Sequence, residues 1–139
     1  MRFVLDTDVM VAAFRSERGA SRLLIFHALE GRCKLLASTA LWLEYEAVLT
    51  RPRQLEAMQL TALEVRSSLA ILSRIVEDVP IRYQWRGILP DADDDLVLEA
   101  AVNGRADLLV TFNQSDFAIG LRQFRPRLAR PAEALSWMR

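Results

Sequence analysis

Short apolar runs that alternate with helical segments constrain the fold of this chain more than any other feature. Three such runs occupy residues 3–5, 33–37 and 108–110, and residues that favour a helix start follow them. Runs of this length are typical of buried strands. Buried strands that alternate with helices indicate a parallel sheet with helices on both faces. We therefore predict a single α/β domain over residues 1–139, a three-layer α/β/α sandwich around a central, mostly parallel sheet of four or five strands.

Capping residues and helix breakers predict where the helices begin and end. Thr61 and Glu64 match a capping box, which predicts a helix to about residue 76. Pro52 ends the helix before it, and Gly104 ends a later one. Residues 79–82 and 127–129 are expected to add strands, and residues 86–90 form a loop. Other helices are expected to begin at Thr7 or Asp8, at Ser21, at Ser38 or Thr39, at Asp91, at Asn113 or Ser115, and at Pro131.

The composition excludes several classes of protein. The 18 basic and 18 acidic side chains cancel, which argues against an obligate polybasic nucleic-acid or membrane binder. A chain that is 52% hydrophobic and 26% charged is not typical of disorder. The lone Cys33 cannot form an internal disulfide, and no apolar run has the length of a signal peptide or a membrane helix. We expect a cytoplasmic protein without a membrane partner.

Acidic side chains lie close to the ends of the expected strands. Asp6 ends the first strand, Glu44 lies on a partly apolar helix face after the second, and Asp116 follows the last clear one. Because ligand sites of open α/β sheets lie beyond the carboxyl ends of the strands, these acids should converge on one edge. Crowded carboxylates raise one another's pKa unless a cation lies between them, and oxygen ligands favour Mg²⁺ or Mn²⁺. The remaining acids crowd one helix start: Asp91, Asp93, Asp94 and Asp95.

Each of these acids also has a purely structural interpretation. Aspartates at a helix start cap backbone amides and complement the helix dipole, which would account for Asp6, Asp116 and the acidic helix start separately. A single metal site explains all of these acids on one edge, whereas the structural interpretation requires four independent coincidences. His27 is the only histidine and lies on an apolar helix, so a histidine-based catalytic triad is not expected.

Four segments carry a resemblance to a known family. They are residues 5–9 (LDTDV), residues 38–44 (STALWLE), residues 91–96 (DADDDL) and residues 110–117 (VTFNQSDF). In this order and spacing they resemble the PIN domain, a family of metal-dependent ribonucleases that includes the VapC-type toxins of bacterial toxin–antitoxin pairs. The last segment resembles the family's Thr-x-Asn-x-x-Asp-Phe signature.

The third acid of the family pattern falls on one of two neighbouring residues. Counting back from Thr111 gives Asp95, whereas counting back along the helix from Ala101 gives Asp94. A helix fixes its internal spacing, while the turn at Gly104 tolerates insertion, so we choose Asp94 and keep Asp95 as the runner-up.

The resemblance implies a role for each matched residue. Asp6 and Asp94 would bind the metal most directly, Asp116 would complete the cluster, and Glu44 would bind metal or orient the attacking water. Asn113 stands where some branches have an acid, so it would orient its neighbours by hydrogen bonds. The residues implied in support of the site are Thr7, Thr111 and Asn113.

The implied activity is hydrolysis of phosphodiester bonds in single-stranded RNA with the help of Mg²⁺ or Mn²⁺. The resemblance further implies that the chain is the toxin of a toxin–antitoxin pair, that it forms a homodimer, and that a cognate antitoxin covers the site.

Two other interpretations remain open. Residues 6–9 also resemble the first motif of haloacid-dehalogenase-type phosphatases, with Asp6 as nucleophile, but Lys34 is the only lysine and comes too early for that fold. Alternatively, the chain is a non-catalytic RNA-binding or interaction module whose acids are vestigial or hold a structural ion.

The arginines of the C-terminal segment offset the acids. Five arginines against one glutamate after residue 117 predict a basic rim that grips RNA phosphates beside the acidic cleft. These arginines are Arg122, Arg125, Arg127, Arg130 and Arg139.

Overall fold

Five parallel strands form one sheet in the order β3-β2-β1-β4-β5. The computed structural model describes residues 1–84, 87, 89–122 and 124–138. Register is set by pairs such as Val4 with Leu109 and Leu109 with Leu128. The strands are β1 (Arg2–Leu5), β2 (Lys34–Ala37), β3 (Glu77–Asp78), β4 (Leu108–Val110) and β5 (Arg127–Ala129).

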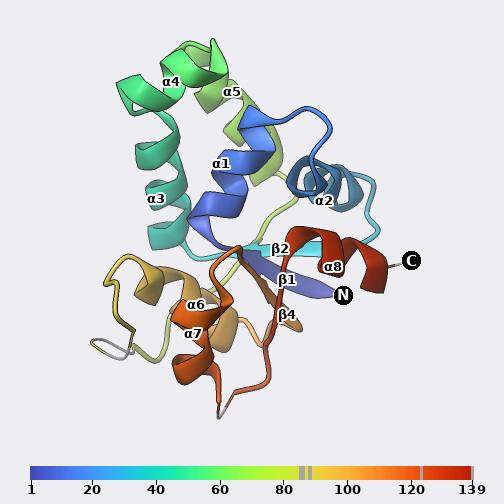
Figure 1. Cartoon of the computed structure of the whole chain (residues 1–139), viewed down its shortest axis with the longest axis vertical. Helices are drawn as coiled ribbons and strands as arrows, with labels where there is room; N and C mark the ends of the chain where they lie inside the picture. Colours follow the sequence, from blue (N-terminus) through green and yellow to red (C-terminus); the bar gives the residue numbers. More distant parts are fainter. Residues whose placement is uncertain (85–86, 88, 123, 139) are drawn as a thin grey trace.

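Helices cover both faces of this sheet, as Figure 1 shows. Helices α6 and α7 lie below the sheet, and α1, α2 and α8 lie above it. The predicted α/β sandwich is therefore confirmed, with every strand pair parallel. The helices are α1 (Thr7–Arg15), α2 (Ala20–Leu29), α3 (Thr39–Leu49), α4 (Pro52–Met58), α5 (Ala62–Ser73), α6 (Asp94–Asn103), α7 (Gln114–Leu121) and α8 (Pro131–Trp137).

The apolar runs of the sequence form the centre of the core. Phe3, Leu35 and Leu109 of three neighbouring strands are completely buried, as is Phe117 of α7. Fully burying such side chains stabilises the fold by about 1.5–3 kcal/mol each. The packed strands hold the residues that follow them at fixed positions along one edge.

Most expected elements are confirmed, and three differ. The capping box of Thr61 and Glu64 is present at the start of α5. Pro52 not only follows one helix but also begins another, α4, because proline fits the first turn of a helix. The strand expected at 79–82 is wrong: the pairing with β2 occurs at Glu77 and Asp78, before Pro80. The expected start at Asp91 is three residues early, and Arg86 and Ile88 of the expected loop lie outside the described residues.

Gly104 ends α6 for a different reason from the one its sequence position suggests. Its φ of −81° is right-handed, so no left-handed cap requires glycine there. A Cβ atom on Gly104 would lie 2.9 Å from Cγ2 of Val79 and 2.8 Å from the Ala100 carbonyl oxygen. Close packing of α6 against the segment after β3 therefore requires a residue without a side chain at position 104.

None of the helices in the described part of the chain combines the length and apolar character needed to span a lipid bilayer.

Candidate metal centre

The carboxyl ends of β1 and β4 form the switch point of the sheet. From β1 the chain first builds β2 and β3 on one side, and then β4 and β5 on the other. In open α/β sheets a crevice opens at such a point, where loops leave in opposite directions. Asp6 directly follows β1, and Thr111 directly follows β4.

Asp6 is a buried carboxylate held across this switch point. Its side chain is only 4% exposed, and its Oδ2 accepts a 2.7 Å hydrogen bond from the Thr111 hydroxyl. Although Asp6 stands at the N-cap position of α1, its side chain makes no cap hydrogen bond. The ordinary capping interpretation is therefore wrong. Burial raises the pKa of Asp6, and the bond from Thr111 opposes that shift.

Two further hydrogen bonds fix the polar groups around Asp6. The Thr111 hydroxyl accepts the backbone N–H of Asn113 at 2.9 Å, so its own proton is free to point at Asp6. The Asn113 side-chain amide donates to Oδ2 of Asp8 at 3.3 Å. The acid that Asn113 contacts is thus Asp8, which was not among the predicted site residues.

Asp94 lies at the start of α6, half-buried and facing the same group of acids. Its pKa is raised to about 7 by burial and by the charges of four other carboxylates. Every one of these influences acts in the same direction. The carboxylates that raise the pKa of Asp94 are Asp6, Asp91, Asp116 and Asp8, in order of decreasing effect.

Asp95 points into different surroundings from Asp94. It is only 2% exposed, and its Oδ1 has no hydrogen-bond partner among the described residues. It does not contribute to the raised pKa of Asp6 or of Asp94. Asp94, and not Asp95, is therefore the residue whose pKa the neighbouring acids raise.

Glu44 is not among the groups that shift the pKa of Asp6 or of Asp94. Its side chain is half-buried on α3, and within the described part of the chain it forms no hydrogen bond or ion pair. The next residue, Tyr45, is completely buried and donates its hydroxyl to the Leu5 carbonyl, one residue before Asp6. The sequence analysis missed Tyr45, whose signal is its place on the inward stripe with Leu41 and Leu49.

The donor set suits a hard cation, although the acids are not yet gathered around one point. In residues 1–84, 87, 89–122 and 124–138, no group of three or more His, Cys, Asp or Glu side chains is close enough to hold a metal ion. Repulsion between carboxylates opposes a closer approach unless positive charge lies between them. No basic side chain is among the groups that shift the pKa of Asp6 or of Asp94, which burial and neighbouring acids raise, so no described cation offsets this charge. Carboxylate oxygens are the ligands that Mg²⁺ and Mn²⁺ prefer.

A family model described as the PIN domain matches residues 2–115. The chain belongs to the PIN domain family. The members of this family are generally metal-dependent nucleases. The match contains Asp6, Glu44, Asp94 and Thr111 and ends one residue before Asp116. Neither a curated protein nor a solved structure matches this chain.

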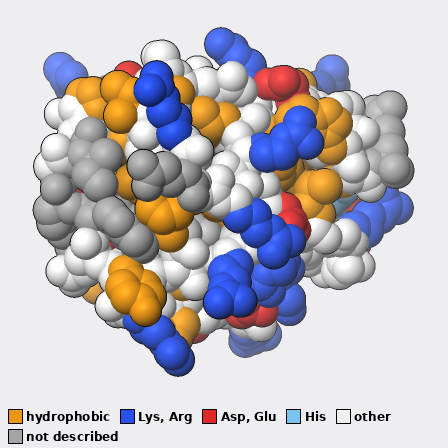
Figure 2. All heavy atoms as spheres, turned by 90° about the horizontal axis from the view of Figure 1, so that it is seen from below, with side chains coloured by type: hydrophobic (Ala, Val, Ile, Leu, Met, Phe, Trp, Pro, Cys, Tyr) orange, Lys and Arg blue, Asp and Glu red, His pale blue; other side chains and the backbone are white. Residues whose placement is uncertain are grey.

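In this PIN domain the C-terminal arginines do not form the expected rim. Arg130 follows β5 and lies at the acidic edge, but Arg127 begins β5 and lies at the opposite edge. Arg125 binds Asp107, which precedes β4 at that same opposite edge. The expected rim is thus split between the two edges, and Arg139 lies outside the described residues. Figure 2 shows basic side chains gathered, with acidic ones between them, on the side where both termini lie in Figure 1.

Proposed function

We propose that this chain is a divalent-metal-dependent endoribonuclease that hydrolyses single-stranded RNA, and that residues 1–139 form a single PIN-like domain. The observation that carries the proposal is the convergence of buried or half-buried carboxylates on the switch point of a parallel sheet. Asp6, Asp94 and Asp116 come from three separate parts of the chain, and the charge of Asp116 raises the pKa of both Asp6 and Asp94. A site with this much uncompensated negative charge favours cation binding over capping.

Asp6, Asp94 and Asp116 would hold Mg²⁺ or Mn²⁺, and Glu44 would bind metal or orient the attacking water. A bound divalent cation would lower the pKa of a water molecule and offset charge on the phosphate. The Thr111 hydroxyl fixes the direction in which Asp6 presents its free oxygen. The Asp94 carboxyl, with a pKa of about 7, gives up its remaining proton when positive charge arrives. Thr7 supports Asp6 through its backbone N–H, which lowers the pKa of Asp6.

We further propose that the chain is the toxin of a toxin–antitoxin pair and forms a homodimer. An apolar groove of about 380 Å³ between α1, α2 and α5 supports this assignment. Phe26 and Ile71 line it and are 45% and 56% exposed, so a partner could bury them. A helix of the antitoxin that lays its apolar face in a groove is a common mode of recognition.

The nuclease proposal is tested with the purified full chain and a labelled single-stranded RNA. Cleavage should require added Mg²⁺ or Mn²⁺ and stop in EDTA. Asp6→Asn should reduce it by about 10²–10³-fold, because the variant loses a ligand charge without changing shape. Glu17→Gln, in an exposed loop, is the matched control and should cleave normally. Full activity of Asp6→Asn would contradict the assignment, and metal binding without cleavage would favour the non-catalytic module. Growth arrest on expression, relieved by the product of the adjacent reading frame, tests the toxin assignment.

A further inference from the structure

The amino edge of the sheet, where the strands begin, is lined by basic side chains. Three adjoining hollows of about 640, 420 and 350 Å³ run across this edge. The carboxylates that line them are Glu77, Asp78 and Asp107. Arg32 also lines the first hollow but is paired with Glu30. We call the other six basic side chains of these hollows the amino-edge basic surface: Arg2, Lys34, Arg74, Arg105, Arg125 and Arg127.

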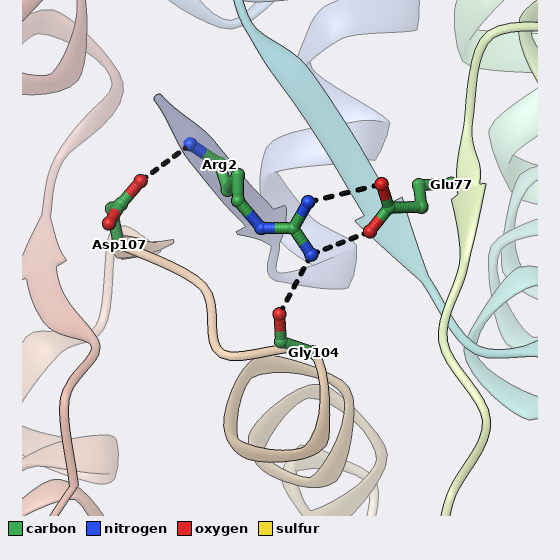
Figure 3. A network of polar contacts seen from close by, with 4 residues as sticks. All are labelled: Arg2, Glu77, Gly104 and Asp107. Atoms are coloured by element: carbon green, nitrogen blue, oxygen red, sulfur yellow. Dashed lines mark hydrogen bonds and ion pairs between the residues drawn. The ribbon is translucent and has the colours of Figure 1, made fainter.

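Two of these cations are used inside the protein. Arg2 donates to both carboxylate oxygens of Glu77, at 3.0 and 2.5 Å, and to the Gly104 carbonyl at 2.9 Å (Figure 3). The backbone N–H of Arg2 binds Asp107, whose other oxygen accepts a 2.8 Å bond from Arg125. These bonds join β1, β3 and the end of α6, so Arg2 and Arg125 have a structural role there.

Three of the other cations are not held by hydrogen bonds in this way, although the charge of Lys34 lowers the pKa of Glu77. Lys34, Arg74 and Arg105 are exposed, and none of them forms an ion pair with a described residue. Arg74 and Arg105 follow the C-termini of α5 and α6, where the helix dipole favours positive charge. The dipole explains why cations are tolerated there, but it leaves their charge available to an external anion.

An aromatic side chain stands at one end of the surface. The Arg127 guanidinium lies 4.7 Å from the centre of the Trp137 ring, and both line the third hollow. Trp137 is 38% exposed, so part of its indole remains open. Cationic grooves that contain aromatic rings are typical of surfaces that bind single-stranded nucleic acid, since every base can stack on a ring.

We propose that the amino-edge basic surface binds the phosphate backbone of a second segment of the RNA that is cut at the acidic edge. This inference rests on the proposed nuclease function. Five strands spaced about 4.8 Å apart make the edge roughly 19 Å wide. Successive phosphates of an extended single strand lie about twice the 3.4 Å duplex spacing apart, so that width holds about three phosphates. The row of hollows with an indole at its end fits a single strand better than a flat lipid surface.

The two edges are too far apart for a short RNA to reach both. Arg2 and Asp6 are separated by the length of β1, and four residues of strand at about 3.3 Å each give roughly 13 Å. Because an extended single strand advances about twice the 3.4 Å duplex spacing per nucleotide, a strand that crosses this depth and lies along the basic edge needs about five nucleotides. Long substrates should therefore gain affinity from the basic surface, whereas a three-nucleotide substrate should not.

The test uses Asp6→Asn in the full chain, so that RNA is bound in EDTA and stays intact. Anisotropy of a labelled 30-nucleotide RNA is measured over a range of salt concentrations. Combined Lys34→Gln, Arg74→Gln and Arg105→Gln changes should weaken binding. They should also reduce the slope of log K against log salt by about 2, or roughly 0.7 per lost phosphate contact. The matched control replaces three exposed arginines on the other side of the chain with glutamine: Arg15, Arg18 and Arg53.

Each outcome separates this inference from the nuclease proposal. An unchanged slope in the triple variant would overturn the inference. It would also be overturned if anionic phospholipid vesicles bound the starting protein but not the triple variant, while the two proteins bound RNA equally well. With otherwise wild-type protein and Mg²⁺, the triple variant should raise KM for the 30-nucleotide RNA several-fold and leave KM for a three-nucleotide RNA unchanged. RNA binding through this surface without any cleavage would support the inference and contradict the nuclease proposal.

Discussion

The carboxylates at the two edges of the sheet have pKa values shifted in opposite directions. At the amino edge, hydrogen bonds from Arg2 and Arg125 lower the pKa of Glu77 and of Asp107. At the carboxyl edge, burial and neighbouring acids raise the pKa of Asp6 and bring that of Asp94 to about 7. One edge neutralises its negative charge with arginines, and the other leaves it uncompensated.

This difference separates a structural role from a functional one. Carboxylates with internal partners stabilise the fold, and their removal should cost stability. Carboxylates that repel one another reduce stability unless an external cation binds, and they are retained for another reason. Substitutions at the two edges should therefore have opposite consequences for activity and for the free energy of unfolding.

The largest expected effect distinguishes Asp94 from Asp95 at the carboxyl edge. Asp94→Asn should reduce RNA cleavage by about 10²–10³-fold, because it removes charge from the acid group. Asp95→Asn should retain most of the activity, because Oδ1 of Asp95 makes no hydrogen bond in the described structure and lies outside that group. Cleavage rates of the two variants under saturating Mg²⁺ check this ranking, and a larger loss for Asp95→Asn would reverse it.

The hydroxyl of Thr111 has the next largest expected effect. Thr111→Val removes the donor to Asp6 and the acceptor of the Asn113 N–H. Loss of such a supporting hydrogen bond should reduce cleavage by about 10–100-fold and stability by about 1–3 kcal/mol. Thr111→Ser keeps the hydroxyl and should restore most of the activity. If valine and serine behave alike in the cleavage assay, the hydroxyl does not position Asp6.

The dependence of stability on pH should report the uncompensated charge directly. The folded chain binds a proton at Asp94 more tightly than the unfolded chain, so metal-free protein should lose stability as pH rises from 5 to 8. Because Asp94 is partly exposed, we expect a loss on the order of 1 kcal/mol. Mg²⁺ at a hundred times its Kd should stabilise the protein by about 2.7 kcal/mol, with the full effect at pH 8.

Thermal or urea unfolding in EDTA and in Mg²⁺ measures this prediction. Asp94→Asn should reduce the loss of stability between pH 5 and 8 and the response to Mg²⁺, whereas Glu77→Gln should keep both. The lowered pKa values of Glu77 and Asp107 act below about pH 4, outside this range. A metal-free protein that gains stability from pH 5 to 8 would contradict the proposed charge state.

The smallest expected effect lies at the amino edge. Glu77→Gln breaks the paired bonds to Arg2 and should lower the free energy of unfolding by about 1 kcal/mol, because the pair is partly exposed. Cleavage of a three-nucleotide RNA should be unchanged, since Glu77 lies at the other end of β1 from the acids. A loss of cleavage equal to that of Asp94→Asn would mean that the two edges are not independent.

Local sequence signals were sufficient for most of the fold. Apolar runs predicted β1, β2 and β4, and the capping-box pattern of Thr61 and Glu64 predicted the start of α5. Both kinds of signal depend on only a few neighbouring residues. The short β3 was misplaced because its two residues, Glu77 and Asp78, pair with β2 without any apolar pattern of their own. Such a pairing depends on the tertiary arrangement.

The acids of the candidate site were proposed from the sequence, but their contacts could not be. The positions of Asp6, Asp94 and Asp116 follow from strand ends and helix starts. The bonds between Asn113 and Asp8, and between Tyr45 and Leu5, join residues 105 and 40 positions apart, and no local pattern encodes them. The split of the C-terminal arginines likewise depends on the direction of β5, which sends Arg127 and Arg130 to opposite edges.

The hydrogen bond between Thr111 and Asp6 also has a consequence for synthesis of the protein. Its partners are separated by 105 residues, so a growing chain contains Asp6 and Glu44 long before it contains Thr111. Until β4 pairs with it, β1 is an edge strand with one open side. Contacts of such high sequence separation form late in folding. A chain that has not yet reached Thr111 therefore has no assembled acid group, and that group is completed only while the last third of the protein is being made.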